Sequence, residues 1–174
     1  MKKIIAILML LCMFTGAALA EAAPELNWAD AEAIIQASEV AGDFVNFDEI
    51  AVKIWIPEGL NAVELSDEDK EAGFIGYFTD AEQTAVLSVV YANVDGTSIE
   101  DYATSLGEMD GVANVAMATV NGMPCVSYDM PEQDSSTVAF ATEAGYILEV
   151  TVAPVSDENA QLVWGVVLSS IQPE

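Results

Sequence analysis

The sequence predicts an α+β fold: a sheet of six to seven mostly antiparallel strands, flanked by about three helices. Residues 50–56 and 146–152 alternate between apolar and other side chains, with the two-residue period of a strand. Several strand-like segments are joined by short turns, which favours antiparallel over parallel pairing. Segments 28–40, 97–106 and 156–170 instead have the capping residues and the length of helices. We therefore expect helices packed on a mostly antiparallel sheet.

Residues 1–20 have the organisation of a secretory signal peptide. Lys2-Lys3 gives a positive start, and the apolar run 4–14 that follows is too short to span a membrane. A small-x-small site at residues 18–20 predicts cleavage before Glu21. We therefore expect a secreted or extracytoplasmic protein that does not insert into the membrane after cleavage.

Two alternatives to a cleaved signal remain open: the segment could be a core helix, or Cys12 could be lipidated. After cleavage, residues 21–174 would form a single α+β domain, large enough for one core without disulfides. Cys125 is then the remaining cysteine, and we expect a small buried hydrophobe rather than a nucleophile. A disulfide between two chains is the alternative for this thiol, but we expect a monomer.

The mature chain begins with a helix and continues with strands. Asn27 can cap a helix over residues 28–40, and Gly42 ends it. The next strand carries isoleucine and valine on one face and Trp55 on the other. The segments predicted here are, in order, a strand at 49–56, a turn at 57–59, a solvated helical turn at 66–71, and strands at 73–79 and 84–91.

A second helix and two hairpins follow. The helix begins at Thr97 or Ser98, each with an acid three residues later, and stops at Gly107. Asn121-Gly122 accepts the two positive φ angles of a type I′ turn and is the strongest local signal in the chain. It joins strands 112–120 and 123–130, and a second hairpin joins 137–142 to 146–153. The last segment, 156–170, contains valines and a glycine, but its length favours a helix.

Short motifs within these elements come in a recognisable order. They are the strand Ile50–Ile56 with Pro57-Glu58-Gly59, the strands through Tyr77 and Val89-Val90-Tyr91, the helix start Ser98-Ile99-Glu100-Asp101, Asn121-Gly122 leading to Tyr128, Gly145-Tyr146-Ile147-Leu148, and Ser169-Ser170-Ile171. This order resembles the PsbP-like superfamily of small secreted or lumenal proteins. The resemblance covers about residues 44–172, most of the mature chain.

The resemblance implies an antiparallel sheet sandwiched by helices and a role in binding rather than catalysis. Members of this superfamily serve as photosystem accessory subunits, small-GTPase binders, and chaperone-like or envelope proteins. No motif in this chain selects one of these roles. The metal-binding members use histidine, which this chain lacks, so metal binding is not carried over.

The charge balance excludes several classes of function. The chain has 29 Asp and Glu residues against 4 Lys and no His. It also lacks Arg, and after cleavage only Lys53 and Lys70 remain, so clusters of cations for binding nucleic acid are missing. Without His, hydrolases with a His base and His-ligated metal or haem sites are excluded, and no cofactor is predicted. A cationic protein or peptide is the partner that this charge favours.

The best pattern for a metal is the alternating set Asp67, Asp69 and Glu71, which resembles the start of an EF-hand loop. The loop requires Gly at its sixth position and Glu at its twelfth, where this chain has Ala72 and Phe78. We therefore keep only weak, non-EF calcium binding at these three acids as an alternative. The other interpretation is a solvated turn.

We favour a secreted, strongly acidic, non-enzymatic binding or accessory domain of unknown partner. A carboxylate-dependent hydrolase of extracellular glycans is an alternative, because its chemistry needs two acids and aromatic walls. Trp28, Trp55 and Trp164 could supply a stacking platform, although Trp55 would lie in the core if both faces of its sheet are covered. Among 29 acids a close pair arises by chance, so no catalytic residue is predicted.

Overall fold

The computed structural model describes residues 24–38 and 40–174. The predicted signal peptide, its cleavage site before Glu21 and Cys12 lie outside the described residues. None of the helices in the described ranges is both long and apolar enough to cross a membrane. The fold class is α+β, as predicted.

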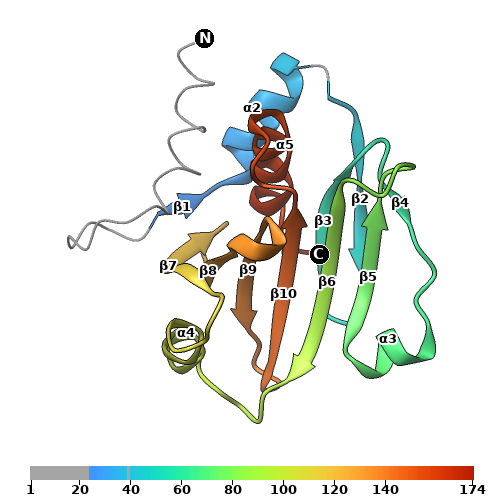
Figure 1. Ribbon diagram of the computed structural model, residues 1–174. Helices are drawn as coiled ribbons and strands as arrows, with labels where there is room; N and C mark the ends of the chain where they lie inside the picture. Colours follow the sequence, from blue (N-terminus) through green and yellow to red (C-terminus); the bar gives the residue numbers. More distant parts are fainter. Residues whose placement is uncertain (1–23, 39) are drawn as a thin grey trace.

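An eight-stranded sheet forms the main layer (Figure 1). Its strands, in spatial order, are β1 (Glu25–Leu26), β7 (Ala113–Val120), β8 (Met123–Met130), β9 (Ser135–Ala141), β10 (Tyr146–Ala153), β6 (Val86–Asn93), β5 (Phe74–Thr79) and β4 (Asn61–Ala62). β1 pairs with β7 in parallel, and the other neighbours in this sheet are antiparallel. The mostly antiparallel sheet and both predicted hairpins are therefore confirmed.

A separate three-stranded sheet corrects the prediction of one sheet with six to seven strands. Its order is β11 (Gln172–Pro173), β3 (Val52–Pro57) and β2 (Gly42–Phe47). β3 is the predicted alternating strand, but it pairs with β2 and β11 rather than with the main sheet. The two sheets contact each other at Gly76 of β5 and Phe47 of β2. A Cβ atom added to Gly76 would lie only 2.6 Å from the Phe47 ring. Glycine at this position therefore lets the sheets approach closely.

The helices match the predicted positions closely. They are α2 (Trp28–Ser38), α3 (Asp67–Glu71), α4 (Ile99–Gly107) and α5 (Glu158–Ser169), with a 3₁₀ turn at Pro131–Gln133. Ser98 caps α4 by accepting from the Asp101 N–H, as one of the two predicted caps. Asp157 caps α5 by accepting from the N–H groups of Asn159 and Ala160.

The two faces of the main sheet are covered differently. On one face, Val150 and its neighbours pack with α2, α5 and the three-stranded sheet in the larger core cluster. On the other face, α4 packs over β7, β8 and β9, where its Ile99 and Leu106 meet Val126 and Ile147. Figure 1 shows α4 at the lower left, beside this end of the sheet, and α2 beside α5 at the top. The hydrophobic contacts of α4 are thus concentrated at the β7–β9 end of its face.

The Asn121-Gly122 turn connects its own hairpin with α2 and with the C-terminal end of α5. Both residues have positive φ, 48° and 80°, as the type I′ prediction requires. The Asn121 side chain accepts from the Trp28 N–H at 2.8 Å, so it caps the N-terminus of α2 from a distant part of the chain. Its amide also donates to the carbonyls of Ser169 and Ile171, each at 2.8 Å. One turn residue therefore links α2 with the end of α5.

Candidate functional site

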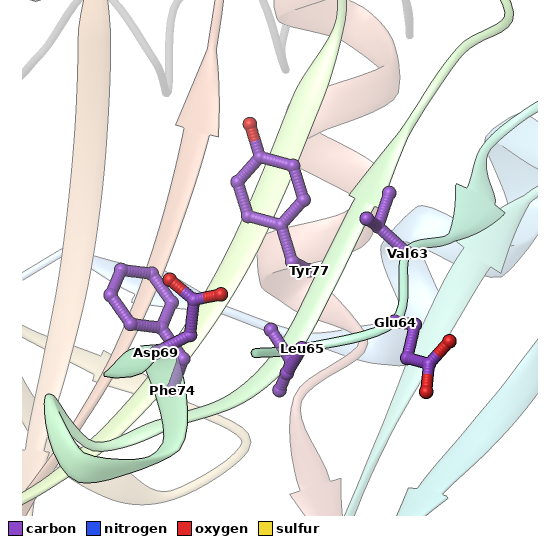
Figure 2. A pocket seen from close by; sticks show the side chains of 6 residues that line it. All are labelled: Val63, Glu64, Leu65, Asp69, Phe74 and Tyr77. Carbon is purple, nitrogen blue, oxygen red and sulfur yellow. The ribbon is translucent and has the colours of Figure 1, made fainter. Parts of the chain in front are cut away.

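A small hollow lies at the β4–β5 edge of the main sheet, on the same side as α4 (Figure 2). The Val63 N–H donates to the Tyr77 carbonyl at 2.8 Å, after which the chain leaves the edge of β5 and enters α3. The chain returns from α3 at Phe74, and the space between holds about 200 Å³. Its lining residues are Val63, Glu64, Leu65, Asp69, Phe74 and Tyr77.

Side chains of two kinds line this hollow. Leu65, Phe74 and Tyr77 are half-buried and supply an apolar surface, while Val63 is 44% exposed. The carboxylates of Glu64 and Asp69 are the charged groups in the lining. Figure 2 shows the Asp69 carboxylate beside the Phe74 ring, whereas the Glu64 carboxylate points outward from the rim of the hollow. This combination suits a side chain that is apolar along its length and positively charged at its end.

The position of Asp69 follows from a capping box at the start of α3. The Asp69 carboxylate accepts from the Ser66 N–H at 2.9 Å and from the Ser66 hydroxyl at 2.6 Å, and its own N–H donates to that hydroxyl at 3.1 Å. These hydrogen bonds, led by the hydroxyl, lower the pKa of the Asp69 carboxyl. Asp69 is therefore a fixed anion of the lining at neutral pH.

The three acids predicted as a weak calcium site all lie in α3. Residues two apart on a helix point in different directions, so Asp69 is separated from Asp67 and Glu71. Among the described residues, no group of three His, Cys, Asp or Glu side chains is placed to hold a metal ion. Asp69 lines the hollow, and the exposed Asp67 and Glu71 are not among its lining residues. The solvated helical turn is confirmed for this segment.

A second polar cluster lies under α4. Glu149 of β10 is half-buried and accepts hydrogen bonds from the Tyr102 hydroxyl of α4, at 2.8 Å, and from the Tyr128 hydroxyl of β8. The pKa values of both phenols are raised, first by burial and then by the negative charge of Glu149. The cluster connects α4 with the sheet below it, and both phenol donors are used within it.

The tryptophans and Cys125 belong to the core. Trp55 is 4% exposed and Trp164 is 3% exposed, and the Trp164 indole donates to the Pro154 carbonyl at 2.8 Å. Trp28 is half-buried and meets the Phe44 ring edge-on at 5.0 Å between centroids. The structure therefore does not form an exposed platform from the three tryptophans. Cys125 is fully buried, and burial raises the pKa of its thiol to about 12, which agrees with the expected unreactive thiol.

Sequence reasoning missed most of the hollow. Val63, Leu65 and Tyr77 received no functional role, and β4 was not predicted because it has only two residues. The available signal was the alternation of Val63 and Leu65 with Ala62 and Glu64. Four alternating residues are too few for strand pairing to be inferred from the local sequence.

Comparison with known proteins identifies the fold. No family model and no curated protein matches this sequence. Among solved structures, the chain is similar to the solution structure of cyanobacterial PsbP (CyanoP) from Synechocystis, with a TM-score of 0.57 and 14% sequence identity over 78% of this chain and 94% of that one. A structure from Bacteroides thetaiotaomicron matches with a TM-score of 0.45 and 12% identity, over 71% of this chain and 45% of that one. The chain therefore has a PsbP-like fold.

Proposed function

We propose that this protein is an extracytoplasmic, acidic accessory domain that binds a cationic protein or peptide without catalysing a reaction. The observation that carries the proposal is the hollow beside α3, whose apolar wall is combined with the carboxylates of Glu64 and Asp69. A lysine or arginine side chain could lay its methylene groups on Phe74 and Tyr77 and place its charge near Asp69, with Glu64 adding negative charge at the rim. The PsbP-like fold is consistent with an accessory role.

The surface charge supports the same partner. Every acidic side chain in the described ranges is exposed or half-buried, so the negative charge faces solvent. Asp67, Glu68 and Glu71 are exposed on α3 beside the hollow. A negative surface attracts a cationic partner and accelerates its association, and salt screens that attraction.

The hydrolase alternative fits the hollow less well. Glu64 and Asp69 do line it together with aromatic side chains, as that alternative requires. A glycoside hydrolase, however, needs one carboxylic acid with a raised pKa, and the Ser66 hydrogen bonds lower the pKa of Asp69. The volume of about 200 Å³ also lies below the range of about 300–1,000 Å³ that is typical of small-molecule sites.

The proposal is tested by titrating the chain that begins at Glu21 with a lysine-rich peptide at low and high salt. We expect binding that weakens about tenfold or more when salt is raised, and no binding of a glutamate-rich peptide of equal length. Glu64→Gln should weaken binding, whereas Glu108→Gln, an exposed acid beyond the far end of α4, should leave it nearly unchanged. Equal binding of both peptides, or no binding of either, would contradict the proposal.

The location has its own test. Mass spectrometry of protein exported from intact cells should show a chain that begins at Glu21. A lipid-modified chain that begins at Cys12 would instead support the lipoprotein alternative.

A further inference from the structure

The strand β2 leaves one edge of the three-stranded sheet open. It is the last strand in the order β11–β3–β2, and within residues 24–38 and 40–174 no strand pairs with its other edge. It pairs with β3 without a register shift along all six residues, Gly42–Phe47. The other outer strands are less regular templates, because β1, β4 and β11 have two residues each. β7 pairs with β1 only at Thr119 and Val120, and it carries a bulge between Ala113 and Ala116.

The direction of each backbone group in β2 follows from two hydrogen bonds. The Glu58 N–H donates to the Ala41 carbonyl at 2.8 Å, so this pair is hydrogen-bonded across the two strands. The Trp55 N–H instead donates to the Ser170 hydroxyl at 2.8 Å, away from β2. Antiparallel pairs alternate between hydrogen-bonded and non-hydrogen-bonded. Alternate residues of β2 therefore direct their N–H and carbonyl groups away from β3, namely Gly42, Phe44 and Asn46.

The side chains near this edge are aromatic and acidic. Phe44 is 37% exposed, and the Lys53 ammonium lies 5.1 Å from the centroid of its ring. Exposed acids lie in β2 and just beyond the ends of the β2–β3 pair, at Asp43, Asp48, Glu49 and Glu58. In a pairing of two copies of this chain through β2, each copy would bring these acids to the same interface.

We propose that the free edge of β2 binds an extended, cationic segment of the partner as an additional antiparallel or parallel strand. Backbone hydrogen bonds to the outward groups of Phe44 and Asn46 would supply affinity, and a basic side chain on the face that carries Asp43 would supply selectivity. The charge of the segment rests on the proposed function, whereas the strand geometry rests on β2 alone. The acids at the edge favour this occupant over a second copy of the chain.

The experiment uses a short peptide of alternating lysine and valine, together with the same peptide N-methylated on alternate amides. Both peptides carry the same charge, but the methylated one cannot donate the hydrogen bonds of an added strand. We expect the methylated peptide to bind about tenfold more weakly. Hydrogen exchange at the amides of Phe44 and Asn46 should slow about tenfold when the unmodified peptide binds, whereas the amides of Asp43 and Val45 should already be protected by β3.

A matched pair of variants tests the outward amide directly. Asn46→Pro removes the outward N–H of residue 46 without removing a hydrogen bond to β3, whereas Asn46→Ala retains that N–H. We expect Asn46→Pro to bind the unmodified peptide about tenfold more weakly and Asn46→Ala to bind it like the wild type. If Asn46→Pro does not fold, binding of the methylated peptide and the amide exchange rates of the wild type still test strand addition.

The outcomes separate this inference from the proposed function. Equal binding of the two peptides, or unchanged exchange at Phe44 and Asn46, would overturn strand addition and leave the cationic partner in place. Failure of the wild type to bind either peptide would overturn both. Protection of Phe44 that grows with protein concentration in the absence of peptide would identify a second copy as the occupant and overturn this inference.

Discussion

Asn121 illustrates how one residue can serve local and long-range structure together. Its positive φ suits asparagine, and its side chain bonds the backbone of Trp28, Ser169 and Ile171. Alanine at this position would strain the turn and leave these backbone groups without their partner. The local role was predictable from the Asn-Gly pair, but the three bonds were not, because they depend on where α2 and α5 pack.

We predict that Asn121→Ala lowers the free energy of unfolding by about 3 kcal/mol, from the strained φ and the lost hydrogen bonds together. Asn114→Ala is the matched control, because Asn114 also has a positive φ of 53° but makes one exposed side-chain bond, to Asp129 at 2.7 Å. It should cost about 1 kcal/mol. Urea denaturation of both variants measures the difference, and equal losses would show that the links to α2 and α5 contribute little.

Cys125 should react only when the protein unfolds. Its thiol is fully buried, and burial raises its pKa to about 12, so the thiolate is scarce and inaccessible at neutral pH. In the chain that begins at Glu21, we expect slow labelling by a thiol reagent in buffer and rapid labelling in denaturing urea. Rapid labelling of the folded protein in mildly acidic buffer would mean that the pKa is depressed and would contradict a purely structural role.

At the scale of elements, the sequence predicted what depends on neighbouring residues. Both hairpins, α4 with its Ser98 cap and the helical turn at α3 are formed by local signals, and all are present. Assignment of β3 to a second sheet depends instead on its two partners: β2, which directly precedes it, and β11, which comes from the far C-terminal end. β2 carries Phe44, Val45 and Phe47, which do not alternate strictly, so its strand signal was weak.

The docking of α4 should depend on Tyr102. This residue connects α4 with Glu149, and hydrogen bonds to charged groups contribute about 1.5–3 kcal/mol. We expect Tyr102→Phe to lower the free energy of unfolding by an amount in this range, and Tyr91→Phe, whose hydroxyl lies 3.5 Å from that of Thr142, to cost less. Urea denaturation measures both, and an equal small effect would show that apolar packing alone holds α4.

The same cluster predicts sensitivity to alkali. The pKa values of Tyr102 and Tyr128 are raised in the folded state, so the folded protein retains these protons where the unfolded chain releases them. Their contribution to stability is therefore complete below the unfolded tyrosine pKa of about 10 and is lost as pH rises above it. Above about pH 10, the urea concentration at the denaturation midpoint should fall less steeply with pH in the Tyr102→Phe/Tyr128→Phe variant than in the wild type. Parallel curves would contradict this linkage.

At the scale of the whole molecule, the sequence predicted the negative charge of the surface but not the position of the hollow on it. The excess of acids was evident from composition, and the described acids do face solvent. The hollow could not be predicted, because it requires Val63 to pair with Tyr77 while α3 returns the chain to Phe74. The same segment carries Asp67, Asp69 and Glu71, whose alternation in the sequence resembled a calcium loop. The segment is a helix, in which residues two apart point in different directions, so these acids do not converge.

The final prediction concerns the stability of so acidic a chain. With Lys53 and Lys70 as the lysines of residues 21–174, acidic groups repel one another more in the compact state than in the expanded chain. Sodium chloride should therefore raise the melting temperature, because the Debye length falls to about 8 Å at 0.15 M salt. Calcium and magnesium at equal ionic strength should act alike, since α3 separates Asp67 from Asp69. A larger rise with calcium that disappears in Asp67→Asn would instead establish a calcium site at α3, and a melting temperature that falls with sodium chloride would show that specific attractions outweigh the repulsion.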